Sequence, residues 1–315
     1  MCIRDRKEPA RLLAAAFLWG AVPALLVALA VEIFFRLPPS LLGPRAIELV
    51  SSGVIGPLIE EALIGAAVLF VAWRHRREFD DVLDGIIYGA VTGLGFAMSS
   101  STVSYLGVFV QYGFASMAHQ VLVEGFLYGL NYALYAAIFG AGLGYARLAH
   151  RRSQRWGVPG AAFVLAVATH ALHNLAIDHT TGWNLQTLAL TWAGFLVLLA
   201  VGLWSMRQER RCLAAELAGE VPDVLYRWLT APGGCWLVEC RVLWRGGPRG
   251  VVRLRRAIQC CTRLAFKKAQ SRRLGEAEAA EEVALLRQKV AQVVEPGVLS
   301  PVSYTHLTLP TNREV

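Results

Sequence analysis

Six long apolar segments, separated by short clusters of arginine, limit this chain to a membrane-embedded fold. A helix needs about 20 apolar residues to cross the hydrocarbon core of a bilayer. The segments that reach this length are 12–35, 54–73, 85–106, 124–146, 158–177 and 186–206. With 55% hydrophobic and 17% charged residues, the chain is too apolar for an ordinary soluble domain. We therefore predict an all-α fold, a polytopic membrane helix bundle of six transmembrane helices.

The placement of arginine predicts the orientation of these helices, because basic residues are enriched in cytoplasmic loops. Arginine clusters stand before the first predicted span and after the second, fourth and sixth, at 4–11, 74–77, 147–155 and 207–211. The alternate connections carry few or no basic residues. We expect a multi-pass protein of the cell membrane with both termini in the cytoplasm. The stretch 107–123 then becomes an external loop or a re-entrant piece.

Glycine recurs at every fourth position in the third and fourth predicted spans. Gly85, Gly89 and Gly93 lie in the third span, and Gly140 and Gly144 lie in the fourth. Residues four apart lie on one face of a helix, so each series forms a smooth stripe that allows a neighbouring backbone to approach closely. We predict tight packing at these stripes.

Composition divides the chain into four regions. We expect a cytoplasmic N-terminus over 1–11, a six-helix transmembrane domain over 12–206, a basic cytoplasmic helical region over 207–298, and a tail over 299–315. Residues 1–6 and 299–315 resemble translated adapter or vector sequence. Both are set aside from the fold prediction.

The basic region is predicted to be a small helical hairpin near the membrane surface. Residues 251–273 carry eight basic residues, and 276–294 places apolar residues at heptad-like spacing. Basic segments beside a transmembrane helix are attracted to anionic lipid, which is the partner expected at the cytoplasmic face. Aromatic side chains are scarce here, so no specific nucleic acid is expected.

Polar side chains within the predicted spans converge at one depth. An ionisable residue in a transmembrane helix costs about 3 kcal/mol and suggests function. The second span places Glu60 and Glu61 in its outer third. The residues at similar depth are Ser100 and Ser101 on the third span, Glu124, Asn131 and Tyr132 on the fourth, and His170, His173 and Asn174 on the fifth. At a rise of about 1.5 Å per residue their depths agree within a turn or two, which predicts one polar layer.

Simpler structural roles exist for some of these residues. Acids that follow Pro57 suit the positive end of a helix dipole, and serines can hydrogen-bond neighbouring helices. His170 and Asn174, one turn apart on one helix face, favour a functional interpretation.

Four motifs carry a resemblance to a known family. They are PLIEE at 57–61, REFDDVLDGIIYGAVTGLGFA at 77–97, GLNYALYAAIFGAGLGYAR at 129–147 and HALHN at 170–174. With these motifs the chain resembles the PrsW family of bacterial intramembrane proteases, in the superfamily that includes the CAAX prenyl endopeptidases. The resemblance covers residues 50–206. It implies a protease-like domain that cleaves a single-span membrane protein, such as an anti-sigma factor, near the external face.

The resemblance also implies the residues of the site. Peptide hydrolysis requires an activated water and a group that stabilises the oxyanion. Glu60 or Glu61 is expected to activate water, with His170 and Asn174 as the polarising pair. The auxiliary candidates are His173, Ser100, Ser101, Glu124, Asn131 and Tyr132.

Members of this family are described either as glutamate-type or as metal-dependent enzymes. The cofactor is therefore either none or a divalent metal such as zinc, for which His170 and Glu61 are the candidate ligands. A catalytic zinc usually has three protein ligands, so a single motif histidine leaves it under-ligated.

The chain departs from the family pattern at several positions. Ile64 stands where a basic residue usually follows the glutamates, Ser100 and Ser101 replace a Glu-Asn pair, Tyr132 replaces a histidine, and Glu124 replaces a basic residue. Two functions follow: an active endopeptidase, or a catalytically inactive relative that binds transmembrane segments or acts as a membrane scaffold. A transporter is disfavoured, because no span is interrupted at its midplane or repeated in inverted form.

Overall fold

A computed structural model describes residues 9–34, 43–76, 79, 81–149, 151–176, 185–231, 234–274 and 277–294. All regular secondary structure in these ranges is helical, which confirms the all-α prediction. The terminal stretches 1–6 and 299–315 lie outside the described residues.

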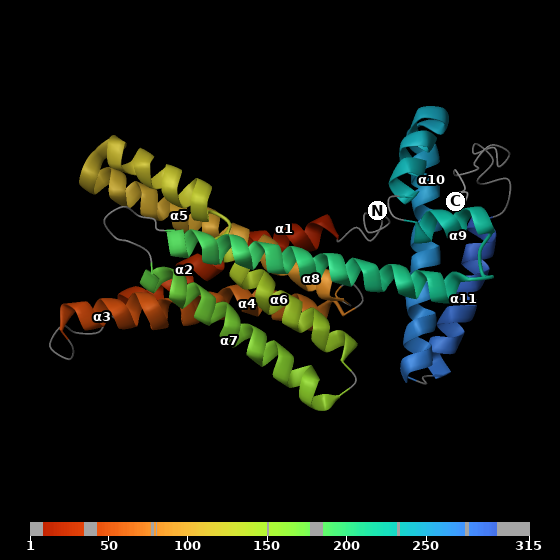
Figure 1. The fold of residues 1–315 in the computed structure, drawn as a ribbon, viewed down its shortest axis with the longest axis horizontal. Helices are drawn as coiled ribbons and strands as arrows, with labels where there is room; N and C mark the ends of the chain where they lie inside the picture. Colours follow the sequence, from red (N-terminus) through yellow and green to blue (C-terminus); the bar gives the residue numbers. More distant parts are fainter. Residues whose placement is uncertain are drawn as a thin grey trace, which may run out of the picture. The chain divides into compact units, whose positions relative to one another are not determined.

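The helices follow one another along the chain (Figure 1), and three π-helical segments lie between them in the described ranges. They are α1 (Ala10–Trp19), a π segment (Gly20–Ala24), α2 (Leu25–Phe34), α3 (Pro44–Val50), a π segment (Ser51–Ile55), α4 (Gly56–Arg74), α5 (Val82–Gln120), a π segment (Val121–Tyr128), α6 (Asn131–Leu148), α7 (Arg152–Ala176), α8 (Leu185–Leu217), α9 (Asp223–Thr230), α10 (Gly234–Leu274) and α11 (Ala277–Val294). The chain forms two compact units, which divide between Ser205 and Met206.

Among the described residues, five helical runs are long and apolar enough to cross a membrane. They are Ala10–Phe34, Arg45–Arg74, Val82–Leu148, Arg152–Ala176 and Leu185–Leu217. The third run contains two of the predicted spans, 85–106 and 124–146. The predicted polytopic helix bundle is therefore confirmed, with six predicted spans in five continuous helical runs.

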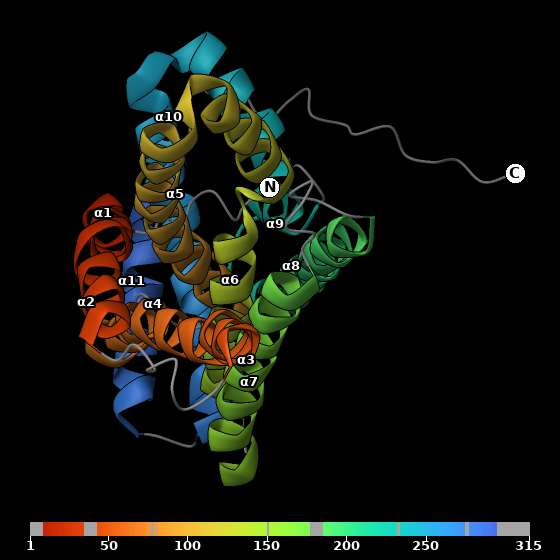
Figure 2. The same ribbon diagram turned by 90° about the vertical axis from the view of Figure 1, so that its left-hand side faces the viewer.

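The stretch 107–123, predicted as a loop or re-entrant piece, is a helical hairpin. α5 continues to Gln120 and reverses at Gly113, whose φ of 82° is a backbone conformation that glycine adopts at low cost (Figure 2). The returning part lies beside the outgoing part, since Gln120 Nε2 donates a hydrogen bond to Ser104 Oγ at 2.8 Å. Of the two expected forms, a helical hairpin is compatible with the re-entrant piece.

The glycine stripes bring α5 and α6 into close contact, as the sequence predicted. A Cβ atom on Gly85 would lie 1.9 Å from the carbonyl oxygen of Gly140, and one on Gly93 would lie 2.2 Å from that of Tyr132. Gly89 meets the backbone of α6 in the same way. Because no side chain fits at these positions, the two backbones pack directly, and the start of α6 is held against α5.

The junction between α4 and α5 is closed by local hydrogen bonds. Asp81 and Asp84 form a capping box, in which each backbone N–H donates to the other carboxylate, at 2.9 and 3.1 Å. Arg147, at the end of α6, donates to the carbonyl oxygens of Ala72 and Phe79 at 2.8 and 3.2 Å. Asp81 and Asp84, two acids of the 77–97 motif, therefore mark the start of α5.

The second unit contains the end of α8 with α9, α10 and α11. α10 is interrupted at Gly247, with φ of 64°, and Arg255 makes two hydrogen bonds to Glu239 across this break at 2.9 and 3.0 Å. The unit has its own apolar core, and α10 and α11 pack against each other (Figure 1). Val283 and Val290, two of the residues at heptad-like spacing, are buried in this core.

Candidate active site

Glu61 of α4 and His170 of α7 meet in the interior of the membrane unit. The Nδ1 atom of His170 lies 3.0 Å from Oε1 of Glu61, to which it donates a hydrogen bond. The side chains are only 3% and 2% exposed. A bond from a ring nitrogen to a carboxylate fixes the tautomer and the orientation of the imidazole. The second ring nitrogen, Nε2, then faces away from Glu61.

Glu60 lies on the other side of the same imidazole. Its Oε2 is 3.8 Å from Nε2 of His170, and this oxygen is buried without a hydrogen-bond partner among the described residues. The side chain as a whole is 25% exposed, in contrast to Glu61. The two adjacent glutamates therefore differ: Glu61 is a buried acceptor for the histidine, whereas Glu60 has a partly exposed side chain whose Oε2 is buried.

Two tyrosines of α6 enclose the His170 ring. Tyr135 stacks on it, with ring centroids 4.7 Å apart and an angle of 18°, and Tyr132 meets it edge-on at 5.1 Å. Tyr132 also makes side-chain polar contacts with Glu60 and Ser100. Through these contacts three of the predicted residues, Glu60, Ser100 and Tyr132, join the Glu61–His170 pair.

A second polar network lies one helical turn farther along α7. The amide nitrogen of Asn131 is 3.3 Å from both ring nitrogens of His173, and Tyr128 packs edge-on against this ring at 4.7 Å. The hydroxyl of Tyr128 is in turn 2.6 Å from that of Thr187 on α8. Oδ1 of Asn131 is buried without a hydrogen-bond partner in the described residues. His173 and Asn131, both predicted, are therefore direct partners.

Asn174 lies outside both networks. Its amide nitrogen donates to the backbone carbonyl of Ser52 at 2.9 Å, in the π-helical segment before α4. A π-helix leaves irregular backbone geometry, and this bond satisfies one of its carbonyls. The structure thus separates His170 from Asn174, although the two share a helix face.

Ser101 and Glu124 belong to a separate polar group at the α5 hairpin. Oε1 of Glu124 accepts a hydrogen bond from Gln120 Nε2 at 2.7 Å, and Tyr105 makes a side-chain polar contact with Ser101. The sequence predicted one polar layer. In the structure its members divide among the His170 site, the His173 network and this group, and Asn174 lies apart from all three.

Ile64 is fully buried, in an apolar cluster with Phe96 and Ala136. The position that carries a basic residue in the family pattern therefore packs in the core. Glu60 finds its polar partners on α6 and α7 instead of on its own helix. Tyr135, which was not among the predicted site residues, also contacts His170; its spacing of three residues from Tyr132 was the available signal.

The residues present do not form a metal site with three protein ligands, which catalytic zinc usually requires. In the described ranges, no group of three or more His, Cys, Asp or Glu side chains is placed to hold a metal ion. Glu61 and Nδ1 of His170 are bonded to each other, and His173 is bonded to Asn131. This leaves the carboxylate of Glu60 and Nε2 of His170 as two groups that could still serve as metal ligands. The donor set does not fit a resident zinc ion.

Comparison with known proteins gives a consistent assignment. A family model described as PrsW family intramembrane metalloprotease matches residues 8–204. A protein named Protease PrsW from Geobacillus kaustophilus is 29% identical over 160 residues, which cover 46% of this chain and 66% of the relative. Another of that name from Oceanobacillus iheyensis is 30% identical over 142 residues, covering 45% and 59%. The chain therefore spans less than two thirds of the length of these relatives. No solved structure matches.

Proposed function

The chain belongs to the PrsW family of intramembrane metalloproteases, and on that basis we propose that it is an endopeptidase that cleaves a single-span, membrane-anchored protein. The observation that carries this proposal is the contact of His170 with both glutamates, 3.0 Å to Glu61 and 3.8 Å to Glu60. An ionisable cluster of this kind is costly inside a membrane helix bundle unless it has a function.

The geometry supports Glu60 as the general base. Its Oε2 has no hydrogen-bond partner among the described residues and lies 3.8 Å from Nε2 of His170, and we propose that a water admitted beside these two atoms is the nucleophile. In the proposed step, this water attacks the scissile carbonyl carbon and its proton passes to Glu60. Glu60 then returns the proton to the leaving amine, which yields a new carboxyl and a new amino terminus.

Glu61 acts through His170 as a positioning residue. It is buried and accepts the hydrogen bond from Nδ1, so the ring is fixed with Nε2 toward Glu60. In its protonated form, Nε2 can donate a hydrogen bond to the carbonyl oxygen as negative charge develops there. Tyr135, stacked on the ring, restrains it further.

The remaining polar groups support this centre. Tyr132 contacts Glu60 and Ser100, and so orients the proposed base. His173, held by Asn131, offers a second histidine one turn from His170, and we assign it the role of the family histidine that Tyr132 replaces. Asn174 receives a structural role, because its amide is committed to the Ser52 carbonyl.

The proposed class of substrate is taken from the resemblance to the family. We propose a single-span membrane protein of the anti-sigma-factor type, cleaved near the external face, with both termini of the protease in the cytoplasm. This topology rests on the arginine clusters that follow the second, fourth and sixth predicted spans.

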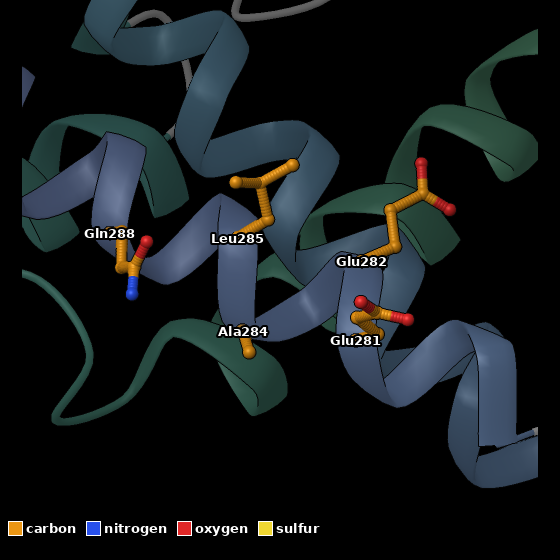
Figure 3. A pocket seen from close by; sticks show the side chains of 5 residues that line it. All are labelled: Glu281, Glu282, Ala284, Leu285 and Gln288. Carbon is orange, nitrogen blue, oxygen red and sulfur yellow. The ribbon is translucent and has the colours of Figure 1, made fainter.

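The test is co-expression of the full chain with a panel of single-span proteins that carry a different tag at each end. Glu60→Ala/Glu61→Ala is the inactive comparison. The matched control is Glu281→Ala/Glu282→Ala, an adjacent glutamate pair on α11 that lines a shallow hollow on the second unit (Figure 3). Cleavage that is lost only in the first double variant supports the proposal.

Cleavage that persists in Glu60→Ala/Glu61→Ala would refute the glutamate mechanism. Failure of the wild-type protein to cleave any member of the panel, together with co-purification of an uncleaved member, would favour the inactive relative that binds membrane segments. Repeating the assay with a chelator tests the metal separately: activity that is lost and then restored by added zinc would contradict the donor set described above.

A further inference from the structure

The second half of α10, after the break at Gly247, carries an arginine stripe on its solvent face. The arginine stripe consists of Arg249, Arg253, Arg256 and Arg263, all of which are exposed. Spacings of four, three and seven residues place these side chains along one face of a helix. At about 1.5 Å per residue, the stripe extends over about 21 Å.

The opposite face of this helix is fixed in the core of the second unit. The buried residues there are Val251, Leu254, Ile258, Cys261 and Leu264. A helix with this face packed in an apolar core cannot rotate, so the arginine stripe remains on the outside.

The charge of the stripe is not balanced by acids of the same unit. Residues 247–274 contain no Asp or Glu. Neighbouring basic side chains are paired: Arg255 binds Glu239 at 2.9 Å, and Lys267 binds Glu282 at 3.0 Å. None of the four stripe arginines has an ion-pair partner among the described side chains. Four exposed guanidinium groups in a row, none of them in an ion pair within the described ranges, are available to bind an anionic partner from outside the unit.

We propose that the arginine stripe binds the phosphate groups of anionic lipids at the membrane surface. The unit begins at Met206, within the helical run Leu185–Leu217 that is apolar enough to cross a membrane, so it is tethered next to a bilayer. Guanidinium groups bind phosphate through paired N–H donors, and a tether raises the effective concentration of the surface. Each arginine near an anionic surface raises the affinity about five-fold, the equivalent of about 1 kcal/mol.

Exposed apolar side chains of the first half of α10 fit the same partner. Trp244 is 91% exposed, and Leu237 and Leu243 are 58% and 54% exposed. Tryptophan favours the headgroup region of a bilayer. A nucleic acid is the less favoured anionic partner, because residues 249–263 contain no aromatic side chain on which bases could stack.

The test measures arginine modification by phenylglyoxal in the intact protein, residue by residue, with mass spectrometry. The protein is placed in nanodiscs of phosphatidylcholine alone or with phosphatidylglycerol. We expect the arginine stripe to react about five-fold more slowly in the anionic nanodiscs. Arg227, exposed on α9, is the internal reference and should react equally in both. At about 1 M salt the protection should disappear, because the Debye length falls to about 3 Å.

Two double variants complete the experiment. Arg253→Gln/Arg256→Gln should abolish the protection of Arg249 and Arg263. The control Arg227→Gln/Lys289→Gln removes the same charge from exposed positions off the stripe and should leave it unchanged.

Equal modification in the two kinds of nanodisc would overturn the proposal. So would equal slowing of Arg227, which would indicate diffuse attraction without a defined face. Protection by an added RNA oligonucleotide in neutral nanodiscs, without protection by anionic lipid, would replace lipid with nucleic acid as the partner. None of these readouts depends on peptidase activity. The lipid-binding proposal can therefore fail or succeed independently of the proposed function.

Discussion

Substituting the two adjacent glutamates one at a time should have unequal effects on cleavage. Glu60→Gln replaces a carboxylate by an amide of the same shape and removes the proposed base. General base catalysis contributes about 10²- to 10⁴-fold, so kcat should fall by that factor, equivalent to about 2.7–5.4 kcal/mol. Since Glu60 is 25% exposed and its Oε2 has no hydrogen-bond partner in the described residues, the fold should be unaffected.

Glu61→Gln should cost much less. The amide oxygen of glutamine can still accept the hydrogen bond from Nδ1 of His170, which is 3.0 Å in the wild type. A hydrogen bond to a charged group contributes about 1.5–3 kcal/mol and a neutral one about 0.5–1.5. The difference of about 1–1.5 kcal/mol corresponds to about a five- to ten-fold loss of kcat. A neutral amide is also easier to bury than a carboxylate, so thermal stability should not fall.

The assay uses purified variants in proteoliposomes with a substrate found in the co-expression panel. Cleavage is followed under single-turnover conditions, and thermal unfolding in detergent controls for folding. A Glu60→Gln variant within about three-fold of the wild-type rate would refute the assignment of the base, given the 10²-fold minimum expected. A larger loss in Glu61→Gln than in Glu60→Gln would reverse the two roles.

Three further predictions concern packing and charge. Gly89→Val should lower the unfolding temperature in detergent, at a cost of about 1–3 kcal/mol, because a Cβ there would lie 2.3 Å from the Ala136 carbonyl; an unchanged melting curve would contradict the close contact. Ile64→Lys should destabilise the protein without increasing cleavage, because this position is fully buried among apolar side chains; higher activity at unchanged stability would be the opposite result. Hydrogen bonds from Arg287 lower the pKa of Glu220 to about 2 from 4.5, so its contribution to stability should be complete above pH 4.5 and lost toward pH 2. In Glu220→Gln, the circular dichroism of thermal unfolding should lose this acid dependence; retention of the wild-type profile would mean that other carboxylates dominate.

The helices and their packing stripes could be predicted because they depend on local pattern. Apolar segments of sufficient length can satisfy their backbone groups in lipid only as helices. Likewise, glycines at four-residue spacing allow any neighbouring helix to approach closely. Gly85, Gly89 and Gly93 form such a series, and the helix that packs against them is α6. The prediction for 107–123 stayed open between a loop and a re-entrant piece, because the reversal depends on a single glycine, Gly113, within a stretch of strong helix character.

The sequence predicted a common depth for the candidate site residues but not their contacts. Topology and rise per residue place Glu61, His170 and Asn174 at similar heights. Which of them meet depends on the rotation of each helix about its axis, and hydropathy alone does not specify this rotation. Asn174 was predicted beside the glutamates, but its amide binds the carbonyl of Ser52. Tyr135 was not among the predicted site residues, yet it stacks on His170.

The sequence by itself thus determined that this chain is a helical membrane protein, because an apolar segment can satisfy its backbone groups in lipid only as a helix. Only the tertiary structure decided which contacts Glu60 and Glu61 each make. Neighbouring residues on a helix point about 100° apart. The packing of α4 against α6 and α7 therefore buries Glu61 against Nδ1 of His170. The same packing leaves the side chain of Glu60 partly exposed near Nε2.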